Sequence, residues 1–177
     1  MYDELTRRTT LGNAAGLERF RAAQDDRHSG FEAALAEIQT GRKRGHWIWF
    51  IFPQLAGLGV SSTSRTYAIR DVAEASGYLR DPLLCARLIT MASAVEEHLS
   101  QGRRLEDLMG SALDARKMVS SLTLFEAVAR DLHQAEGLER WRSLADSAER
   151  VLDAAERQGM ARCPFTLAAL RTPAKHE

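Results

Sequence analysis

Hydrophobic positions recur along most of the chain with the spacing of amphipathic helices. Phe31, Ala34, Leu35 and Ile38 fall at i, i+3, i+4 and i+7, which places them on one face of a helix. Comparable patterns predict helices at 17–24, 71–79, 81–101, 114–136, 138–158 and 164–170, with a single turn or short helix at 105–109. The polar positions between these stripes are typical of solvated helix faces.

Several expected helix ends carry recognisable capping residues. Asp71 with Glu74 three residues later resembles a capping box, and Asp81 before Pro82 is typical of a cap followed by the first helical position. We expect Asp114 to cap the helix that follows it. Glycines placed to end helices are Gly41, Gly102, Gly110, Gly137 and Gly159.

Residues 47–52, Trp-Ile-Trp-Phe-Ile-Phe, form the longest uniformly apolar run, and Pro53 ends it. Periodicity cannot separate a buried helix from a buried strand over so short a run. The sequence therefore predicts an all-α fold, a compact multi-helix bundle of about seven helices. The open alternative at 47–52 is one short buried extended segment.

The length of 177 residues is typical of one domain. Residues 1–15 show no sustained period, so we expect a disordered leader there, a single helical domain over 16–171 and a disordered tail at 172–177.

Composition narrows the function classes. A formal net charge of +0 gives no overall basic field for nucleic acid, so a nucleic-acid partner is not expected. The run at 47–52 is too short to span a membrane, and we expect no membrane partner.

The N-terminal residues lack the apolar stretch of a signal peptide, and Cys85 and Cys163 lie far apart. We expect a cytoplasmic protein with free thiols, and no metal or cofactor, since the five histidines show no metal-binding spacing.

A basic segment leads directly into the aromatic run. Arg42, Lys43, Arg44 and His46 could form an anion site, because guanidinium and ammonium groups bind phosphate or carboxylate and a histidine can exchange protons near neutral pH. The alternative is a solvated helix end, where cations interact favourably with the helix dipole.

Three further residues of this block are candidate ligand contacts. Trp47 and Trp49 could stack on a nucleobase, or they could simply be core aromatics. Gln54 could bind an amide or a base edge, or its side chain could bond the local backbone in a turn.

A second polar group occurs in the 114–136 segment. Asp114, Lys117, Ser120 and Ser121 are three or four residues apart and share one helical face. A partly desolvated lysine there could hold an anion or act as a base. The alternative is a capping aspartate supported by a lysine three residues later.

Three blocks of the chain resemble a known family. The first comprises Gly41-Arg42-Lys43, His46-Trp47, the stretch 49–54 and Gly57-Leu58-Gly59; the second comprises Tyr78-Leu79, Pro82-Leu83 and Arg87-Leu88; the third comprises Asp114, Lys117 and 120–125. Together they are similar to the domain-of-unknown-function family 1810, over about residues 17–130. The resemblance implies a mostly helical, compact single domain and no established activity. Some members carry the label calpastatin, which we regard as a mistaken transfer.

The leading functional hypothesis combines the two polar blocks. We expect a pocket between segments 42–54 and 114–123 that binds a small anionic ligand, a nucleotide or nucleotide-sugar. If the ligand is hydrolysed, His46 or Asp114 would supply acid–base function while Arg44 and Lys117 hold the anion. The alternative is a non-enzymatic protein-interaction module, in which the aromatic block is structural and the 138–158 helix binds a partner or a second copy.

Overall fold

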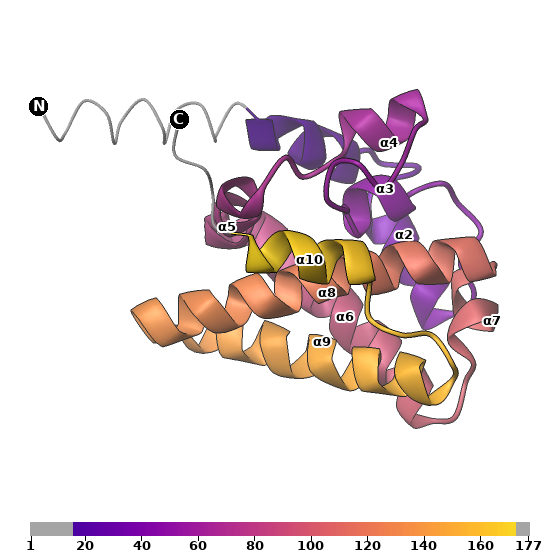
Figure 1. Cartoon of the computed structure of the whole chain (residues 1–177). Coiled ribbons are helices and arrows are strands. Elements are labelled where there is room, and N and C mark those ends of the chain that lie inside the picture. Colours follow the sequence, from indigo (N-terminus) through magenta and orange to yellow (C-terminus); the bar gives the residue numbers. More distant parts are fainter. Residues whose placement is uncertain (1–15, 173–177) are drawn as a thin grey trace, which may run out of the picture.

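A computed structural model describes residues 16–172, and these residues form a bundle of helices (Figure 1). Residues 16–24 are helical. The helices that follow are α2 (Phe31–Gln39), α3 (Ile48–Ile51), α4 (Ser62–Thr66), α5 (Val72–Arg80), α6 (Pro82–Ser100), α7 (Leu105–Met109), α8 (Ala112–Glu136), α9 (Glu139–Arg157) and α10 (Pro164–Arg171). The predicted all-α class is therefore confirmed. The predicted leader 1–15, and the tail 172–177 after its first residue, lie outside the described residues.

Helix α8 lies at the centre of the bundle. All residues from 118 to 125 are buried, so this part of the helix is enclosed on every side rather than along one stripe. Helix α9 runs back along α8 after a tight turn at Gly137, whose φ of 70° is the left-handed conformation that glycine adopts without strain (Figure 1).

The remaining helices enclose this central pair. Helix α6 packs on α9, and α2 packs on α6, while α3, α5, α7 and α10 each contact α8. The apolar face of α9, which includes Trp141, Leu144, Ala148 and Val151, is buried in this packing. Helix α10 returns the C-terminal part of the described chain to α8 (Figure 1).

Most of the local capping expectations are met. The Asp81 carboxylate accepts from the backbone N–H groups at positions 83 and 84, and that of Asp71 accepts from the N–H of Glu74. The expectation for Asp114 was wrong. Ser111 caps α8 by accepting from the Asp114 N–H at 3.1 Å, which places Asp114 in the first turn with its carboxylate available for other partners.

The apolar run at 47–52 is a helical turn, so the extended alternative does not hold. The N–H of Ile51 donates to the Trp47 carbonyl and that of Phe52 donates to the Ile48 carbonyl. A turn satisfies these buried backbone groups internally, whereas a strand would need a neighbouring strand to bond them. Among the described residues, no helix is both long and apolar enough to cross a membrane.

Candidate functional site

Glu37, a partly exposed residue of α2, holds the basic-aromatic segment in place. One carboxylate oxygen of Glu37 accepts from the backbone N–H of Arg44 at 2.7 Å, from that of Gly45 at 2.9 Å and from the indole N–H of Trp47 at 2.8 Å. Burial raises the pKa of Glu37, but these bonds outweigh it and the net pKa is lowered. Sequence reasoning missed Glu37, because nothing in its local spacing distinguishes it from other acids on a solvated helix face.

Lys43 points into the protein although its sequence neighbours are exposed. Its backbone N–H donates to the Leu108 carbonyl at 2.7 Å, which ties the segment to α7. Its ammonium donates to the Gly45 carbonyl at 2.5 Å and pairs with the Asp114 carboxylate at 2.6 Å. Only 5% of the Lys43 side chain is exposed, so its charge is largely removed from water.

Asp114 joins this lysine to a second one. The other carboxylate oxygen of Asp114 accepts from the Lys117 ammonium at 2.8 Å, and the side chains of Asp114 and Lys117 are 17% and 14% exposed. The Lys117 ammonium lies 3.8 Å from the centre of a Trp49 ring, a close cation–π contact. The structure therefore brings together four residues from two separate blocks: Lys43, Trp49, Asp114 and Lys117, which we call the lysine–aspartate cluster.

The electrostatics of this cluster keep Asp114 ionised. Burial raises the pKa of Asp114, but hydrogen bonds from Lys117 and Lys43 and their positive charges outweigh that effect, so the net pKa is lowered. Two ammonium groups contact this one carboxylate, and the Lys43 charge also acts on Glu37, whose pKa it helps to lower. The lowered pKa makes Asp114 a poor proton donor near neutral pH.

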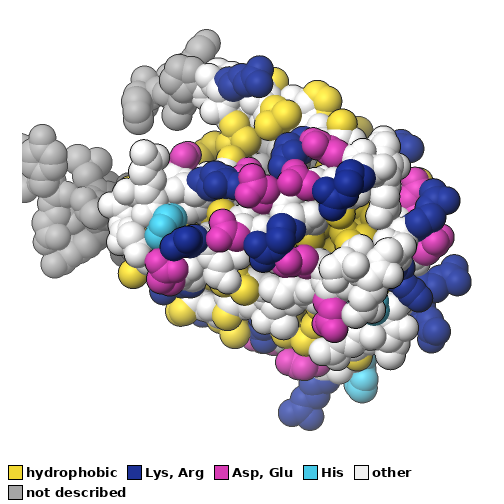
Figure 2. Space-filling model, turned by 90° about the horizontal axis from the view of Figure 1, so that it is seen from below, with side chains coloured by type: hydrophobic (Ala, Val, Ile, Leu, Met, Phe, Trp, Pro, Cys, Tyr) yellow, Lys and Arg dark blue, Asp and Glu magenta, His cyan; other side chains and the backbone are white. Residues whose placement is uncertain are grey.

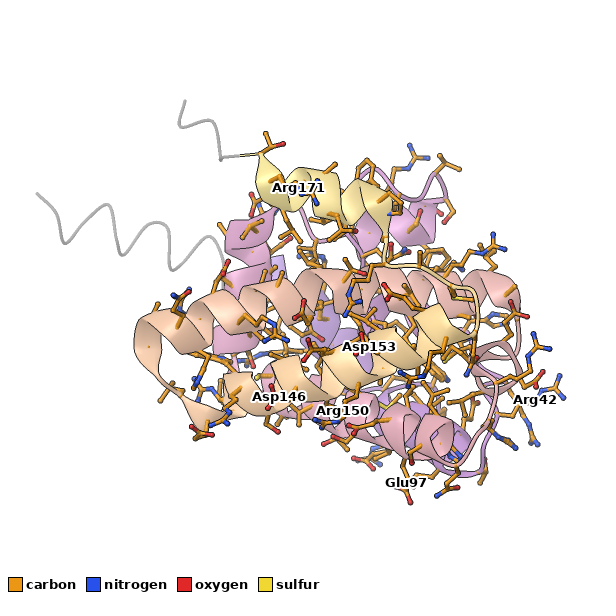
Figure 3. All side chains as sticks on the ribbon, turned by 60° about the horizontal axis from the view of Figure 1, so that its bottom comes forward. Arg42, Glu97, Asp146, Arg150, Asp153 and Arg171 are labelled. Atoms are coloured by element: carbon orange, nitrogen blue, oxygen red, sulfur yellow. The ribbon has the colours of Figure 1, made fainter. Side chains whose placement is uncertain are left out.

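The other basic candidates lie elsewhere. Arg42, Arg44 and His46 are exposed, and Arg42 projects from the edge of the molecule (Figure 3). Arg42 instead borders a surface hollow of about 310 Å³, together with Arg103 from the segment after α6. The basic run is thus divided, with Lys43 buried and Arg42, Arg44 and His46 exposed.

The aromatic and polar candidates also differ in position. Trp47 is buried beside Glu37, whereas Trp49 and Gln54 are partly exposed, and the backbone carbonyl of Gln54 accepts from the N–H of Ile69 at 2.8 Å. Ser120 and Ser121 are both buried in α8. The Ser121 hydroxyl has no hydrogen-bond partner among the described residues.

Metal-ligand chemistry receives no support from the described part of the chain. Residues 16–172 contain no group of three or more His, Cys, Asp or Glu side chains placed to hold an ion. The lysine–aspartate cluster itself offers fixed charges, hydrogen-bond donors and an aromatic surface.

The sequence of most of the chain matches a family model. A family model described as "Protein of unknown function (DUF1810)" matches residues 14–150, which include every member of the lysine–aspartate cluster. The crystal structure of the conserved hypothetical protein Rv1873 from Mycobacterium tuberculosis is similar, with 32% sequence identity and a TM-score of 0.64. The similarity covers 86% of this chain and 94% of that one. No curated protein matches the chain.

Proposed function

The chain belongs to the DUF1810 family of proteins of unknown function, and from that starting point we propose that it binds a small anionic ligand at the lysine–aspartate cluster. The ligand class is a nucleotide or nucleotide-sugar. A cytoplasmic location suits this proposal, because both cysteines are free thiols.

The observation that carries the proposal is the pair of lysines beside Asp114, in which Lys117 has Asp114 as its one ion-pair partner among the described residues. A buried or partly buried charge is costly unless it is paired, and here two lysines share one carboxylate. The Lys43 ammonium contacts Asp114 and the Gly45 carbonyl. The Lys117 ammonium makes one hydrogen bond among the described residues, to Asp114. Because an ammonium group has three donors, Lys117 is the residue best placed to bind an incoming phosphate oxygen.

Trp49 supplies the second element of recognition. Its indole is partly exposed and lies against the Lys117 ammonium, so an anion held by Lys117 would be next to an aromatic surface. Aromatic rings stack on nucleobases with little dependence on base identity. The pairing of a cation with a tryptophan is what favours a nucleotide over a simple inorganic anion.

Hydrolysis of a phosphate-ester or glycosidic bond is the enzymatic extension of the proposal. Asp114 is ionised and bonded to both lysines, so we assign it the role of positioning them rather than that of an acid. His46 is then the remaining acid–base candidate, and because it is exposed and outside the lysine–aspartate cluster, hydrolysis would require a ligand that extends from the cluster to His46. The test is product formation from a bound ligand by the wild-type protein and by His46→Ala.

Ligand binding is tested by thermal denaturation with a panel of nucleotides, nucleotide-sugars and inorganic phosphate. A ligand at about 100 times its dissociation constant stabilises the fold by about 2.7 kcal/mol, and for a chain of this length that raises the melting temperature by roughly 5–10 °C. Lys117→Gln should abolish the shift. Arg116→Gln is the matched control, because it removes the same charge from an exposed position on the same helix. A panel without any shift, or equal shifts in both variants, would contradict the proposal.

The rival proposal, an interaction module that uses the 138–158 segment, needs exposed apolar residues there, and the one large exposed apolar side chain of that segment is Leu138. The large apolar residues of α9 are buried, and the outer face of that helix carries charged side chains that pair within the protein, such as Arg150 with Glu96 and Arg142 with Asp146. Figure 2 shows basic and acidic side chains intermingled on one such face, and Figure 3 shows Asp146, Arg150 and Asp153 along α9. This surface is typical of a solvated helix.

A further inference from the structure

Two adjoining surface hollows lie at the end of the bundle where α2 and α6 end. Their volumes are about 540 Å³ and about 310 Å³, and Thr40, Gly41, Arg103 and Asp107 line both of them. We call the pair the arginine hollow. Neither part is lined by a member of the lysine–aspartate cluster, because Lys43 points inward from the same segment. The larger part has the size of a pocket for a small organic molecule.

Charged side chains border the arginine hollow. Three arginines, Arg42, Arg103 and Arg104, line it together with two carboxylates, those of Glu106 and Asp107. Glu106 lies 3.4 Å from Arg104, so Arg42 and Arg103 outnumber the one remaining carboxylate. Arg42 projects at this edge of the molecule (Figure 3). A lining of this kind favours an anion that also carries hydrogen-bond donors for a carboxylate.

Arg103 is anchored at two points although it is exposed. Its Nη1 group donates to the Gly41 carbonyl at 2.8 Å. Its own backbone carbonyl accepts from the side-chain amide of Gln158 at 3.2 Å, and the amide oxygen of Gln158 accepts from the N–H of Leu105 at 2.8 Å. A guanidinium has five N–H donors, so the others stay available to a ligand. A donor that is positioned in advance loses less conformational freedom on binding.

Gly41 makes the close approach of Arg103 possible. Its φ of 88° is the left-handed conformation that suits glycine, and a Cβ at this position would lie 2.7 Å from Nη1 and 3.0 Å from Cζ of Arg103. A residue with a side chain would therefore be strained and would displace the guanidinium. The position of the guanidinium depends on the absence of a side chain at residue 41.

Helix dipoles account for only part of this arrangement. Cations after the C-terminal end of a helix interact favourably with its dipole, which explains positive charge beyond α2 and α6. The carbonyls at these ends already accept backbone N–H groups, however. Gly41 donates to Ile38 at 2.8 Å, and Gly102 donates to Leu99 at 3.0 Å. Capping therefore does not require the arginine side chains, and the anchoring of Arg103 on Gly41 needs another reason.

We propose that the arginine hollow binds a phosphorylated sugar, at a site separate from the lysine–aspartate cluster and independent of the function proposed there. The phosphate accepts hydrogen bonds from Arg103 and Arg42, because guanidinium groups match phosphate oxygens in pairs. Asp107 lines both parts of the hollow and accepts from the sugar hydroxyl groups. The size of the larger part leaves room for the sugar ring in addition to the phosphate.

The first test is a titration of the ¹⁵N-labelled full-length protein with glucose 6-phosphate, followed by NMR. Inorganic phosphate and glucose are titrated in parallel. We expect saturable shifts of the backbone amide signals of residues 40–42 and 101–107, and a dissociation constant for glucose 6-phosphate about tenfold or more below that for either fragment. Shifts confined to residues 114–120, equal affinity for inorganic phosphate, or no saturable shift would each overturn the proposal.

The second test removes the anchored guanidinium. We expect Arg103→Gln to raise the dissociation constant for glucose 6-phosphate by about tenfold or more, because a charge-assisted pair of hydrogen bonds is lost. Arg65→Gln is the matched control, since it removes the same charge from an exposed position in α4. Lys117→Gln separates this proposal from the other one, because it should abolish nucleotide binding and retain the binding of glucose 6-phosphate. Equal dissociation constants for Arg103→Gln and Arg65→Gln would refute the assignment of the phosphate to Arg103.

The third test asks whether the anchoring itself matters. Gly41→Ala keeps every charge but displaces the Arg103 guanidinium, so we expect it to weaken binding of glucose 6-phosphate as well. Gly137→Ala is the matched control for backbone strain, because Gly137 has a φ of 70° and no neighbour within 4 Å of an added Cβ. Circular dichroism verifies folding, and Arg103→Gln remains decisive if Gly41→Ala does not fold. Unchanged affinity in folded Gly41→Ala would contradict the role of the anchored conformation.

Discussion

Replacing Asp114 by asparagine is expected to destabilise the protein by much more than the loss of a surface ion pair. The variant keeps the size and shape of the side chain but removes the negative charge that faces Lys43 and Lys117. Two ammonium groups would then face each other across a neutral amide. Lys43 would keep its bond to the Gly45 carbonyl but lose its one ion pair among the described residues.

The magnitude follows from the burial of the three side chains. Exposed pairs contribute about 0.2–1 kcal/mol, whereas removing one partner of a buried pair costs about 3–5 kcal/mol. The Lys43 side chain is 5% exposed, whereas those of Asp114 and Lys117 are 17% and 14% exposed. This partial burial places the expected loss between the value for an exposed pair and the value for a fully buried pair. We therefore expect a loss of about 2–3 kcal/mol, or roughly 4–12 °C in melting temperature for a chain of this length.

The assay is urea denaturation of the wild type, Asp114→Asn, Lys43→Met and the double variant. Asp107→Asn, at an exposed position in α7, is the matched control for loss of one carboxylate. A double-mutant cycle isolates the Lys43–Asp114 coupling, which we expect to be favourable by about 1–3 kcal/mol.

The pH dependence of this difference has a defined sign. The pKa of Asp114 is lowered in the folded protein, so its contribution to stability is fully present above the unfolded pKa of about 3.9. That contribution is lost as the pH falls through the lower folded pKa. The wild type should therefore exceed Asp114→Asn in stability near neutral pH, and the difference should shrink in strong acid.

Two results would refute this account of the cluster. One is a loss below about 0.5 kcal/mol at neutral pH, which is the behaviour of a solvated pair. The other is a stability difference between the wild type and Asp114→Asn that does not change as the pH falls. In either case the lysines would be satisfied by water, and the charge of Lys117 could not support the proposed ligand binding.

Two further substitutions test how the site is positioned. Glu37→Gln removes the charged acceptor for three N–H groups, so we expect a loss of about 1–3 kcal/mol by urea denaturation, against less than about 0.5 kcal/mol for the exposed control Glu97→Gln. Equal losses would show that Glu37 does not hold the segment. Gly110→Ala combines a φ of 75° with a new Cβ only 2.8 Å from the Lys43 carbonyl oxygen, whereas Gly102→Ala has a φ of 84° but no neighbour within 4 Å. Each should lose about 1–2 kcal/mol from backbone strain, and Gly110→Ala should lose more in the same urea assay; equal losses in the two variants would contradict the close contact.

The sequence by itself determined the helical architecture, because the signals for helices are local. Apolar spacing of three and four residues identifies a buried face within a few turns, and a cap acts on N–H groups two or three positions away. Asp81 before Pro82 and the glycine at position 137 could therefore be placed correctly without any tertiary information. The same local reading predicted that Asp114 and Lys117 share a helical face, and the structure has them hydrogen-bonded.

Only the tertiary structure decided which of these polar residues meet. Ser111 rather than Asp114 caps α8, and this frees the Asp114 carboxylate to reach Lys43, which is more than 70 positions away in the chain. The hydrogen bond that the Gly45 N–H donates to Glu37, together with the backbone contact with α7, turns Lys43 inward, while Arg42 stays in solvent. These contacts depend on which surfaces pack together. The pattern of residues within one segment therefore does not predict which distant residue will face it.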